Sequence, residues 1–268
     1  MKYEDLEKYK SIITSYDYTV TNITEPTVAG SQHNLLIADT AAGKRIFKFN
    51  TRQIIQKNVA AANLYNIRKI PVPNAIMGNV NNTYFETYRA LNGITLDQAI
   101  KAGIGAQQIQ QIYEHIITLI AKMDHIYPEL LPQNPMNHIH NIGAHYVANN
   151  VSRIAAPIAK CALRSVNRGP SRDSAVYHSG MTPKNTIVSS DGKFVGFVDL
   201  DEICVCNRNY AFAMMAAKYQ QLGMDYTDLI KQYECVSNFT IDYPTVSGLA
   251  RKLNAIRHIM WKLQKRTK

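Results

Sequence analysis

The first third of the chain alternates apolar and polar positions with the period of β-strands, and one helical stretch interrupts this pattern. The pattern predicts strands at residues 18–23, 35–39, 45–50 and 83–88, and helices at 6–13 and 52–66. In the third of these strands, Ile46 and Lys48 fall on one face, and Phe47 and Phe49 on the other. Lys48 is therefore either a lysine aimed at an anion such as a phosphate or an ordinary surface lysine.

The rest of the chain follows mainly the helical period. Helices are predicted at residues 96–101, 107–125, 138–165 (two, broken near Pro157), 210–221, 226–234 and 245–264. Three short β-rich runs lie among them, at 174–177, 186–189 and 194–198, and a Ser-Asp-Gly turn joins the last two as a hairpin. We expect an α+β chain with an N-terminal lobe of residues 1–93 and a helical lobe of residues 94–268.

Composition limits the class of protein. The chain has 268 residues, of which 46% are hydrophobic, and its formal charge is +10. It is long enough for a sizeable core, its longest apolar stretches are too short for a transmembrane helix, and its charged N-terminus lacks a signal-like core. We therefore expect a cytoplasmic globular protein. The basic C-terminal helix fits an anionic partner or an ordinary solvated face, and charge alone is weak support for nucleic-acid binding.

Residues 174–199 contain the most informative polar pattern. His178 opens a polar loop, Asn185 follows seven residues later, and Asp199 ends the third β-rich run. This layout places an amide and a carboxylate at neighbouring strand ends, where two oxygen ligands can share a magnesium ion. Turn-forming Asn and strand-ending Asp are common on their own. The joint spacing of the three residues favours the metal site.

This segment resembles the aminoglycoside phosphotransferase and choline kinase-like family of small-molecule kinases. The family's catalytic loop is His-x-Asp-x-x-x-x-Asn followed by a strand that ends in Asp, and here Gly180 occupies the position of the catalytic Asp. The resemblance implies a bilobal protein kinase-like fold, with ATP and Mg²⁺ as cofactors and a small hydroxyl-bearing acceptor. It also implies Asn185 and Asp199 as metal ligands, Asp201 as a second or water-mediated ligand, and a structural role for His178.

The resemblance assigns nucleotide-binding residues in the N-terminal lobe. The stretch around Gly30 and Ser31 is similar to the family's phosphate-covering loop, although one glycine alone also fits a hairpin turn. Lys48 corresponds to the lysine that binds nucleotide phosphates. Residues 87–91 resemble the hinge that binds adenine mainly through its backbone. The hinge residues with candidate contacts are Thr87, Tyr88 and Arg89.

Three departures from the family pattern bear on activity. Gly180 has no carboxylate to deprotonate the acceptor hydroxyl, the helix after Lys48 contains no Asp or Glu, and Ala211 stands where a helix Asp braces the catalytic loop. The expected function is an ATP- and Mg²⁺-dependent O-phosphotransferase that is inactive or weakly active, unless Asp173 or Asp201 acts as the base. The alternative is a pseudokinase that binds nucleotide or serves as a scaffold. The basic stretch at residues 151–185 favours a neutral or anionic acceptor over a cationic one.

Overall fold

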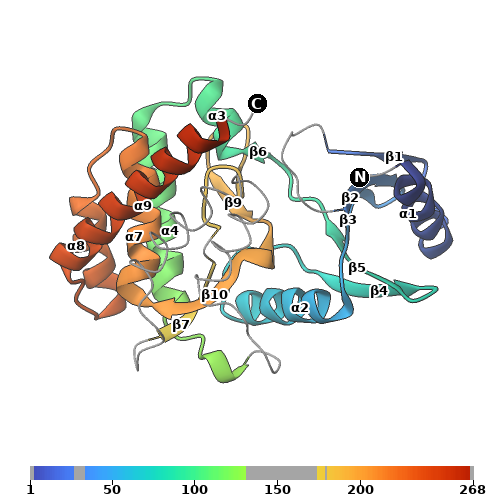
Figure 1. Ribbon diagram of the computed structural model, residues 1–268, viewed down its shortest axis with the longest axis horizontal. Helices are drawn as coiled ribbons and strands as arrows, with labels where there is room; N and C mark the ends of the chain where they lie inside the picture. The colour runs from blue at the N-terminus through green and yellow to red at the C-terminus, as the bar shows by residue number, and fades with distance from the viewer. Residues whose placement is uncertain (1–2, 27–33, 131–173, 179, 266–268) are drawn as a thin grey trace.

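The computed structural model describes residues 3–26, 34–130, 174–178 and 180–265. It has a bilobal α+β architecture of the protein kinase type, with a smaller lobe around an antiparallel sheet and a larger helical lobe (Figure 1). The predicted fold class is thereby confirmed. The helices expected at 138–165 and the loop around Gly30 and Ser31 lie outside the described residues.

The smaller lobe is built on one five-stranded antiparallel sheet. Its strands lie in the order β1 (Asn22–Thr24), β2 (Asn34–Thr40), β3 (Gly43–Phe49), β5 (Thr83–Arg89) and β4 (Ile76–Val80), and its helices are α1 (Tyr3–Tyr16) and α2 (Arg52–Ile67). Phe47, Phe49 and Phe85 pack with Ile13 of α1 in one buried cluster. Because side chains alternate along a strand, Lys48 and Glu86 face the opposite side of the sheet.

The larger lobe is mainly helical. Its helices are α3 (Leu96–Lys101), α4 (Ala106–Met123), α7 (Arg208–Gln221), α8 (Thr227–Ser237) and α9 (Tyr243–Lys265), with short 3₁₀ turns η1 (Pro128–Leu130) and η2 (Leu200–Glu202). Strands β6 (Ile94–Thr95), β8 (Thr186–Val188) and β9 (Phe194–Phe197) form one sheet, and β7 (Ser174–His178) pairs with β10 (Ile203–Asn207). The apolar stripe of α4 is buried, as its helical spacing predicted.

One predicted strand boundary in the smaller lobe was wrong, and one strand was missed. The strand expected at 18–23 is only Asn22–Thr24, because Asp17 accepts hydrogen bonds from the backbone and hydroxyl of Thr19 and so forms a turn. Strand β4 was not predicted, since its Gly and Asn interrupt the apolar pattern. The turn that follows consists of Asn81 and Asn82, whose positive φ angles of 49° and 59° suit asparagine.

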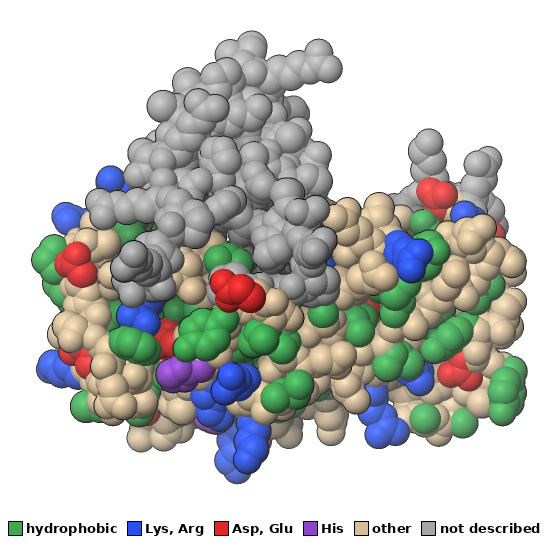
Figure 2. All heavy atoms as spheres, turned by 90° about the horizontal axis from the view of Figure 1, so that it is seen from below, with side chains coloured by type: hydrophobic (Ala, Val, Ile, Leu, Met, Phe, Trp, Pro, Cys, Tyr) green, Lys and Arg blue, Asp and Glu red, His purple; other side chains and the backbone are tan. Residues whose placement is uncertain are grey.

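The described helices contain no stretch that is both long and apolar enough to cross a bilayer. On the face shown in Figure 2, Lys and Arg side chains occur in separate small groups, between Asp, Glu and hydrophobic side chains. Mixed charge of this kind is the usual composition of a protein surface. The positive charge of the chain therefore does not form one continuous patch among the described residues on this face.

Candidate functional site

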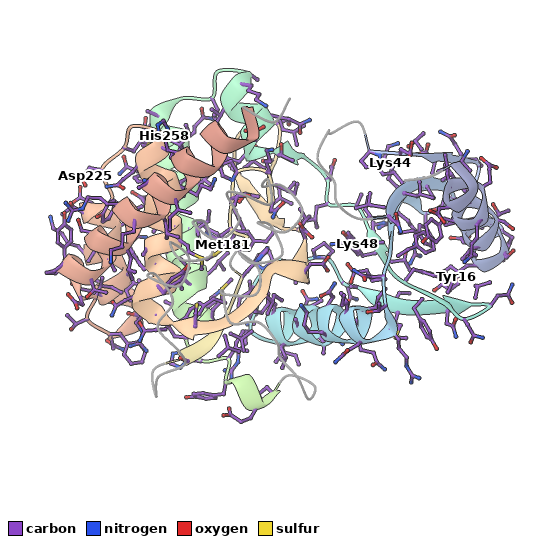
Figure 3. All side chains as sticks on the ribbon, in the orientation of Figure 1. Tyr16, Lys44, Lys48, Met181, Asp225 and His258 are labelled. Atoms are coloured by element: carbon purple, nitrogen blue, oxygen red, sulfur yellow. The ribbon has the colours of Figure 1, made fainter. Side chains whose placement is uncertain are left out.

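Lys48 joins the two lobes. It extends from β3, its side chain is only 3% exposed, and its ammonium hydrogen-bonds Asp199 Oδ1 at 2.5 Å. The same nitrogen lies 2.7 Å from Asp201 Oδ2. Figure 3 shows Lys48 between the sheet of the smaller lobe and the rest of the molecule. Lys48 is thus a buried lysine held by two carboxylates from the segment that follows β9.

Asp199 lies just after the end of β9 and has a left-handed backbone conformation, with φ 65° and ψ 62°. A residue other than glycine in this conformation carries a modest local strain, of the kind that recurs at ligand-binding sites. Its side chain is 29% exposed, more than that of Lys48 or Asp201. Asp199 therefore combines an ion pair inside the protein with access to a ligand.

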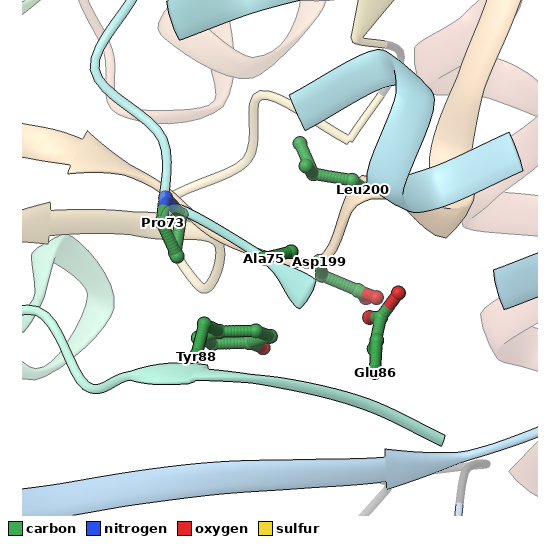
Figure 4. Close-up of a pocket in the computed structure, with 6 residues that line it drawn as sticks. All are labelled: Pro73, Ala75, Glu86, Tyr88, Asp199 and Leu200. Atoms are coloured by element: carbon green, nitrogen blue, oxygen red, sulfur yellow. The ribbon is translucent and has the colours of Figure 1, made fainter. Parts of the chain in front are cut away.

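Both lobes contribute to a pocket beside Lys48, which we call the interlobe pocket. Its lining residues are Pro73, Ala75, Glu86 and Tyr88 from the smaller lobe, and Asp199 and Leu200 from the larger lobe. Figure 4 shows the carboxylates of Glu86 and Asp199 directed toward each other, with the Tyr88 ring along one side. The pocket therefore has apolar walls and an acidic end.

Glu86 is a polar group that the sequence analysis did not identify. It pairs with Lys48 across β3 and β5, its residue is 3% exposed, and its Oε2 has no hydrogen-bond partner among the described residues. Burial raises the pKa of Glu86 to about 7, although the nearby Lys48 ammonium opposes this shift. The available signal was an acid in an apolar strand, but only the strand pairing places it beside Lys48.

Three carboxylates therefore surround one ammonium group. Burial alone would lower the pKa of Lys48, but the charges of Asp199, Asp201 and Glu86 outweigh that effect and raise the pKa well above its ordinary value. Lys48 is consequently charged at every physiological pH. Because three acids face one lysine, this cluster of charged side chains favours the binding of a further cation.

Helix α2 reaches this group through an amide. Asn58 is 1% exposed, and its side-chain nitrogen donates to Asp201 Oδ1 and also hydrogen-bonds Glu86. The preceding residue, Lys57, donates to the backbone oxygen of Asp201 at 3.2 Å. The sequence indicated that α2 has no acid for Lys48. The structure places Asn58 on the face of α2 that meets Asp201.

His178 is buried at the end of β7, and backbone groups occupy both of its ring nitrogens. Nε2 lies 3.0 Å from the carbonyl oxygen of Val198, and Nδ1 accepts a hydrogen bond from the N–H of Gly180 at 3.2 Å. This pattern requires the neutral tautomer with its proton on Nε2. Burial lowers the pKa of His178, in keeping with the neutral form. His178 thus holds the loop at Gly180 against the strand that leads to Asp199.

Asn185 lies next to the segment that leads from β9 to Asp199. Its carbonyl oxygen accepts a hydrogen bond from the N–H of Val198 at 2.9 Å. Val198 directly precedes Asp199, so this bond holds the backbone of Asn185 close to Asp199. The two residues supply the amide and carboxylate oxygens that Mg²⁺ prefers. The described residues contain no cluster of three or more His, Cys, Asp or Glu with a geometry suited to a metal ion.

The other predicted nucleotide-binding residues have different positions. Tyr88 lines the interlobe pocket, and burial raises its pKa. Thr87 falls on the opposite face of the sheet, where its hydroxyl accepts from Arg45 at 3.4 Å. Arg89 points to the turn between β2 and β3 and donates to the backbone of Ala42 at 3.1 Å. Of these hinge residues, the structure brings only the Tyr88 side chain to the pocket.

Ala211 is fully buried in α7, so this position supplies no carboxylate to the loop at Gly180. A different buried carboxylate lies behind β7. Asp124 accepts hydrogen bonds from the hydroxyls of Tyr177 and Tyr233, the latter at 2.5 Å, and lies 3.6 Å from Arg208 Nε. Tyr177 immediately precedes His178. Asp124 therefore connects α4, α7 and α8 to the strand that carries the loop.

No protein-family model matches this chain, and no curated protein matches it in sequence. Solved structures do resemble it. An aminoglycoside phosphotransferase in complex with GDP and kanamycin is 13% identical, with a TM-score of 0.66 over 93% of this chain and 89% of that one. The aminoglycoside phosphotransferase APH(3'')-Id from Streptomyces rimosus, in complex with ADP and streptomycin, is 14% identical, with a TM-score of 0.62 over 93% and 98%.

The choline kinase LicA from Streptococcus pneumoniae is also similar, at 11% identity and a TM-score of 0.63 over 98% of this chain and 92% of that one. The similarity extends over nearly the whole length of each chain. At this level of identity it establishes the shared fold, which is the fold that the resemblance of residues 174–199 implied. Function has to be argued from the site.

Proposed function

We propose that this chain is a nucleotide-binding protein of the small-molecule O-phosphotransferase type, with weak or no transfer activity. The observation that carries the proposal is the meeting of Lys48 and Asp199 beside a pocket formed by both lobes. A lysine that binds phosphates and an aspartate that binds metal are the two charged elements that phosphoryl transfer requires on the nucleotide side. The shared fold with aminoglycoside phosphotransferases and choline kinase supports this interpretation.

The proposed metal is Mg²⁺, held by Asn185 and Asp199. The fit rests on their adjacent backbones and on the acidic end of the pocket, where Glu86 adds a carboxylate. Mg²⁺ typically uses one or two protein oxygens and takes its other ligands from phosphates and water. When bound, Mg²⁺ would neutralise phosphate charge. Asp201 was predicted as a second or water-mediated ligand, but its carboxylate is engaged by Lys48 and Asn58.

The loop side of the site lacks a base. Gly180 offers only backbone groups: its N–H donates to His178, and its carbonyl oxygen accepts from the N–H of Thr182. His178 cannot accept the proton of an acceptor hydroxyl, because Nδ1 already accepts from Gly180 and Nε2 carries a proton. Asp173, which was considered as a substitute, lies outside the described residues. Loss of general-base help costs about 10²–10⁴ in rate, whereas positioning and electrostatic stabilisation can remain.

A pseudokinase is the second candidate. The observation that favours it is the absence of acidic groups at Gly180, in the loop that corresponds to the family's catalytic loop, and at Ala211, where the family has a helix Asp that braces that loop. In that case the pocket binds nucleotide and the chain serves as a scaffold. The proposed acceptor of an active form is a small neutral or anionic alcohol. This part of the proposal rests on the basic stretch at residues 151–185.

A thermal-shift experiment tests the proposed nucleotide site. ATP with Mg²⁺ at about 100 times the dissociation constant should stabilise the folded protein by about 2.7 kcal/mol. Mg²⁺ alone and ATP with EDTA are the controls. Both should give smaller shifts in melting temperature, because the first lacks the nucleotide phosphates and the second lacks the metal that neutralises their charge. No shift at saturating ATP or GTP with Mg²⁺ would exclude the nucleotide-binding proposal. Transfer to a panel of alcohols then separates the enzyme from the pseudokinase.

A further inference from the structure

Lys48 needs a fixed partner if it is to be aimed at a ligand. Its side chain is long and flexible, and the helix that follows it in sequence, α2, has no Asp or Glu. Two acids contact the ammonium group, Asp199 at 2.5 Å and Asp201 at 2.7 Å. If Asp199 also binds a metal, it divides its carboxylate between the metal and Lys48. Asp201 is the other acid in contact with the Lys48 ammonium.

Asp201 is better suited than Asp199 to be a fixed partner. Its side chain is 13% exposed, against 29% for Asp199. One of its oxygens faces Lys48, and the other accepts a hydrogen bond from the Asn58 amide. The backbone of Asp201 is held as well, by the ammonium of Lys57. Two consecutive residues of α2 therefore fix Asp201 in place.

We propose that Asp201 is the positioning residue for Lys48, and that Asn58 connects α2 to the lysine through this carboxylate. The carboxylate that orients the lysine thus comes from the turn after β9, and the helix contributes a neutral amide. A movement of α2 would shift Asn58, then Asp201, and then the Lys48 ammonium. This inference rests on the proposed function only for its consequence, the aim of Lys48 at a nucleotide phosphate.

Asp199 and Asp201, which are two residues apart in sequence, have different roles in this arrangement. Asp199 faces the interlobe pocket and is available to a ligand, whereas Asp201 faces α2. Glu86 adds negative charge near Lys48. Asn58 hydrogen-bonds the Glu86 carboxylate, but among the described residues the Oε2 atom of Glu86 has no hydrogen-bond partner. Removal of Asp201 should therefore leave Lys48 charged but poorly oriented, because among the described residues Asp199 is then the one acid within ion-pair distance.

The first test is a double-mutant cycle on unfolding, which needs no nucleotide. Lys48→Met, Asp201→Asn and the double variant are compared with the wild-type chain in urea. If the two side chains are coupled, the effect of the double variant on the unfolding constant should differ from the product of the single effects by about tenfold. Asn58→Ala keeps every charge and should weaken the same coupling. Additive effects, or a coupling unchanged by Asn58→Ala, would overturn the proposal.

The second test measures MgATP affinity by calorimetry. Asp201→Asn should weaken binding about tenfold when Lys48 is present, and less than twofold in the Lys48→Met background. Adding Asn58→Glu to Asp201→Asn restores a carboxylate from the helix side and should recover most of the lost affinity. A general structural defect would not be rescued in this way.

A different role for Asp201 would also be visible. If Asp201→Asn lowered the affinity for Mn²⁺ alone as much as Asp199→Asn does, Asp201 would be a metal ligand and the proposal would be wrong. If the wild-type chain bound no nucleotide, the proposed function would fail. The unfolding cycle would still decide whether Asp201 holds Lys48.

Discussion

The two sides of the interlobe pocket differ in how many of their chemical groups are in place. On the sheet side, Lys48, Glu86 and Asn58 are buried and connect to Asp199 and Asp201 through short polar contacts. On the loop side, both ring nitrogens of His178 bind backbone groups, and Gly180 has no side chain. The charged groups of the pocket are therefore concentrated on the sheet side, and the position of Gly180 on the loop side carries none.

The difference has a physical basis. Lys48, Asp199 and Asp201 are mutually dependent, since removing one of them would leave another charge without compensation. Their retention is thus favoured by stability alone. A catalytic base near the acceptor has no such structural support, and its loss costs the fold little. The comparison predicts different responses to substitutions on the two sides.

The largest expected effect is a gain of transfer in Gly180→Asp. The variant restores a carboxylate beside the attacking hydroxyl, so transfer should rise by about 10²–10⁴ over the wild-type chain. Initial rates with ATP, Mg²⁺ and a panel of alcohols measure the change, and Gly180→Asn is the control without charge. High transfer by the wild-type chain would mean that another group is the base. No gain, with nucleotide binding intact, would favour the pseudokinase.

Asp124→Asn should reduce stability strongly without involving the pocket. The side chain of Asp124 is fully buried, and it accepts from Tyr177 and Tyr233 and faces Arg208. Loss of its charge leaves a mostly buried guanidinium without a counter-ion, at a cost of about 3 kcal/mol in the free energy of unfolding. Asp228→Asn, which breaks an exposed pair with Lys231, should cost at most about 0.5 kcal/mol. Equal effects in urea unfolding would contradict the account of this network.

Glu86→Gln should stabilise the protein at high pH but not at low pH. The pKa of Glu86 rises from 4.5 in the unfolded chain to about 7 in the folded one, so between these values the unfolded chain releases a proton that the folded chain keeps. Wild-type stability therefore falls as pH rises through this window. Near pH 8 the variant avoids a cost of roughly 3 kcal/mol, whereas near pH 4 the two should match.

Urea unfolding of both chains at pH 4, 6 and 8 measures this difference, with Asp228→Asn as an exposed acid control. A pH-independent difference between Glu86→Gln and the wild-type chain would mean that the pKa of Glu86 does not change on folding. If the stability of the wild-type chain instead rose relative to the variant between pH 4 and 6, Lys48 would hold the pKa of Glu86 below its ordinary value. Its carboxylate would then be a fixed ion-pair partner of Lys48, and not a group kept neutral by burial.

The smallest expected effect concerns cationic acceptors. The basic residues that precede the catalytic loop should repel kanamycin-like ligands, so we expect no appreciable affinity at physiological salt. Calorimetry in the presence of MgATP provides the measurement. A micromolar dissociation constant would contradict this expectation and would indicate that the acidic end of the pocket dominates acceptor binding.

Local pattern predicted much of the fold and the main charged residues. Strand alternation placed Lys48 opposite Phe47 and Phe49, and the structure confirms that arrangement. The paired strands also place Asn185 beside the end of β9, where Asp199 follows. The role of that pair as metal ligands remains a prediction.

The other site residues could not be predicted from sequence, because they depend on contacts between distant parts of the chain. Glu86 lies beside Lys48 only because β5 pairs with β3, and Asn58 meets Asp201 across nearly 150 residues of sequence. Neither partner has a local signal, since a single Glu in a strand and a single Asn in a helix are ordinary residues. The sequence showed that α2 lacks an acid, but not which group takes its place.

We have proposed that the nucleotide side of the site is intact while the loop side is not. Calorimetric titration of MgATP into the wild-type chain, Asp199→Ala and Gly180→Asp tests it most directly. We predict binding by the wild-type chain, affinity reduced at least about tenfold in Asp199→Ala because the metal ligand is lost, and affinity within about threefold of wild type in Gly180→Asp. Absence of binding by the wild-type chain, or wild-type affinity in Asp199→Ala, would contradict the account.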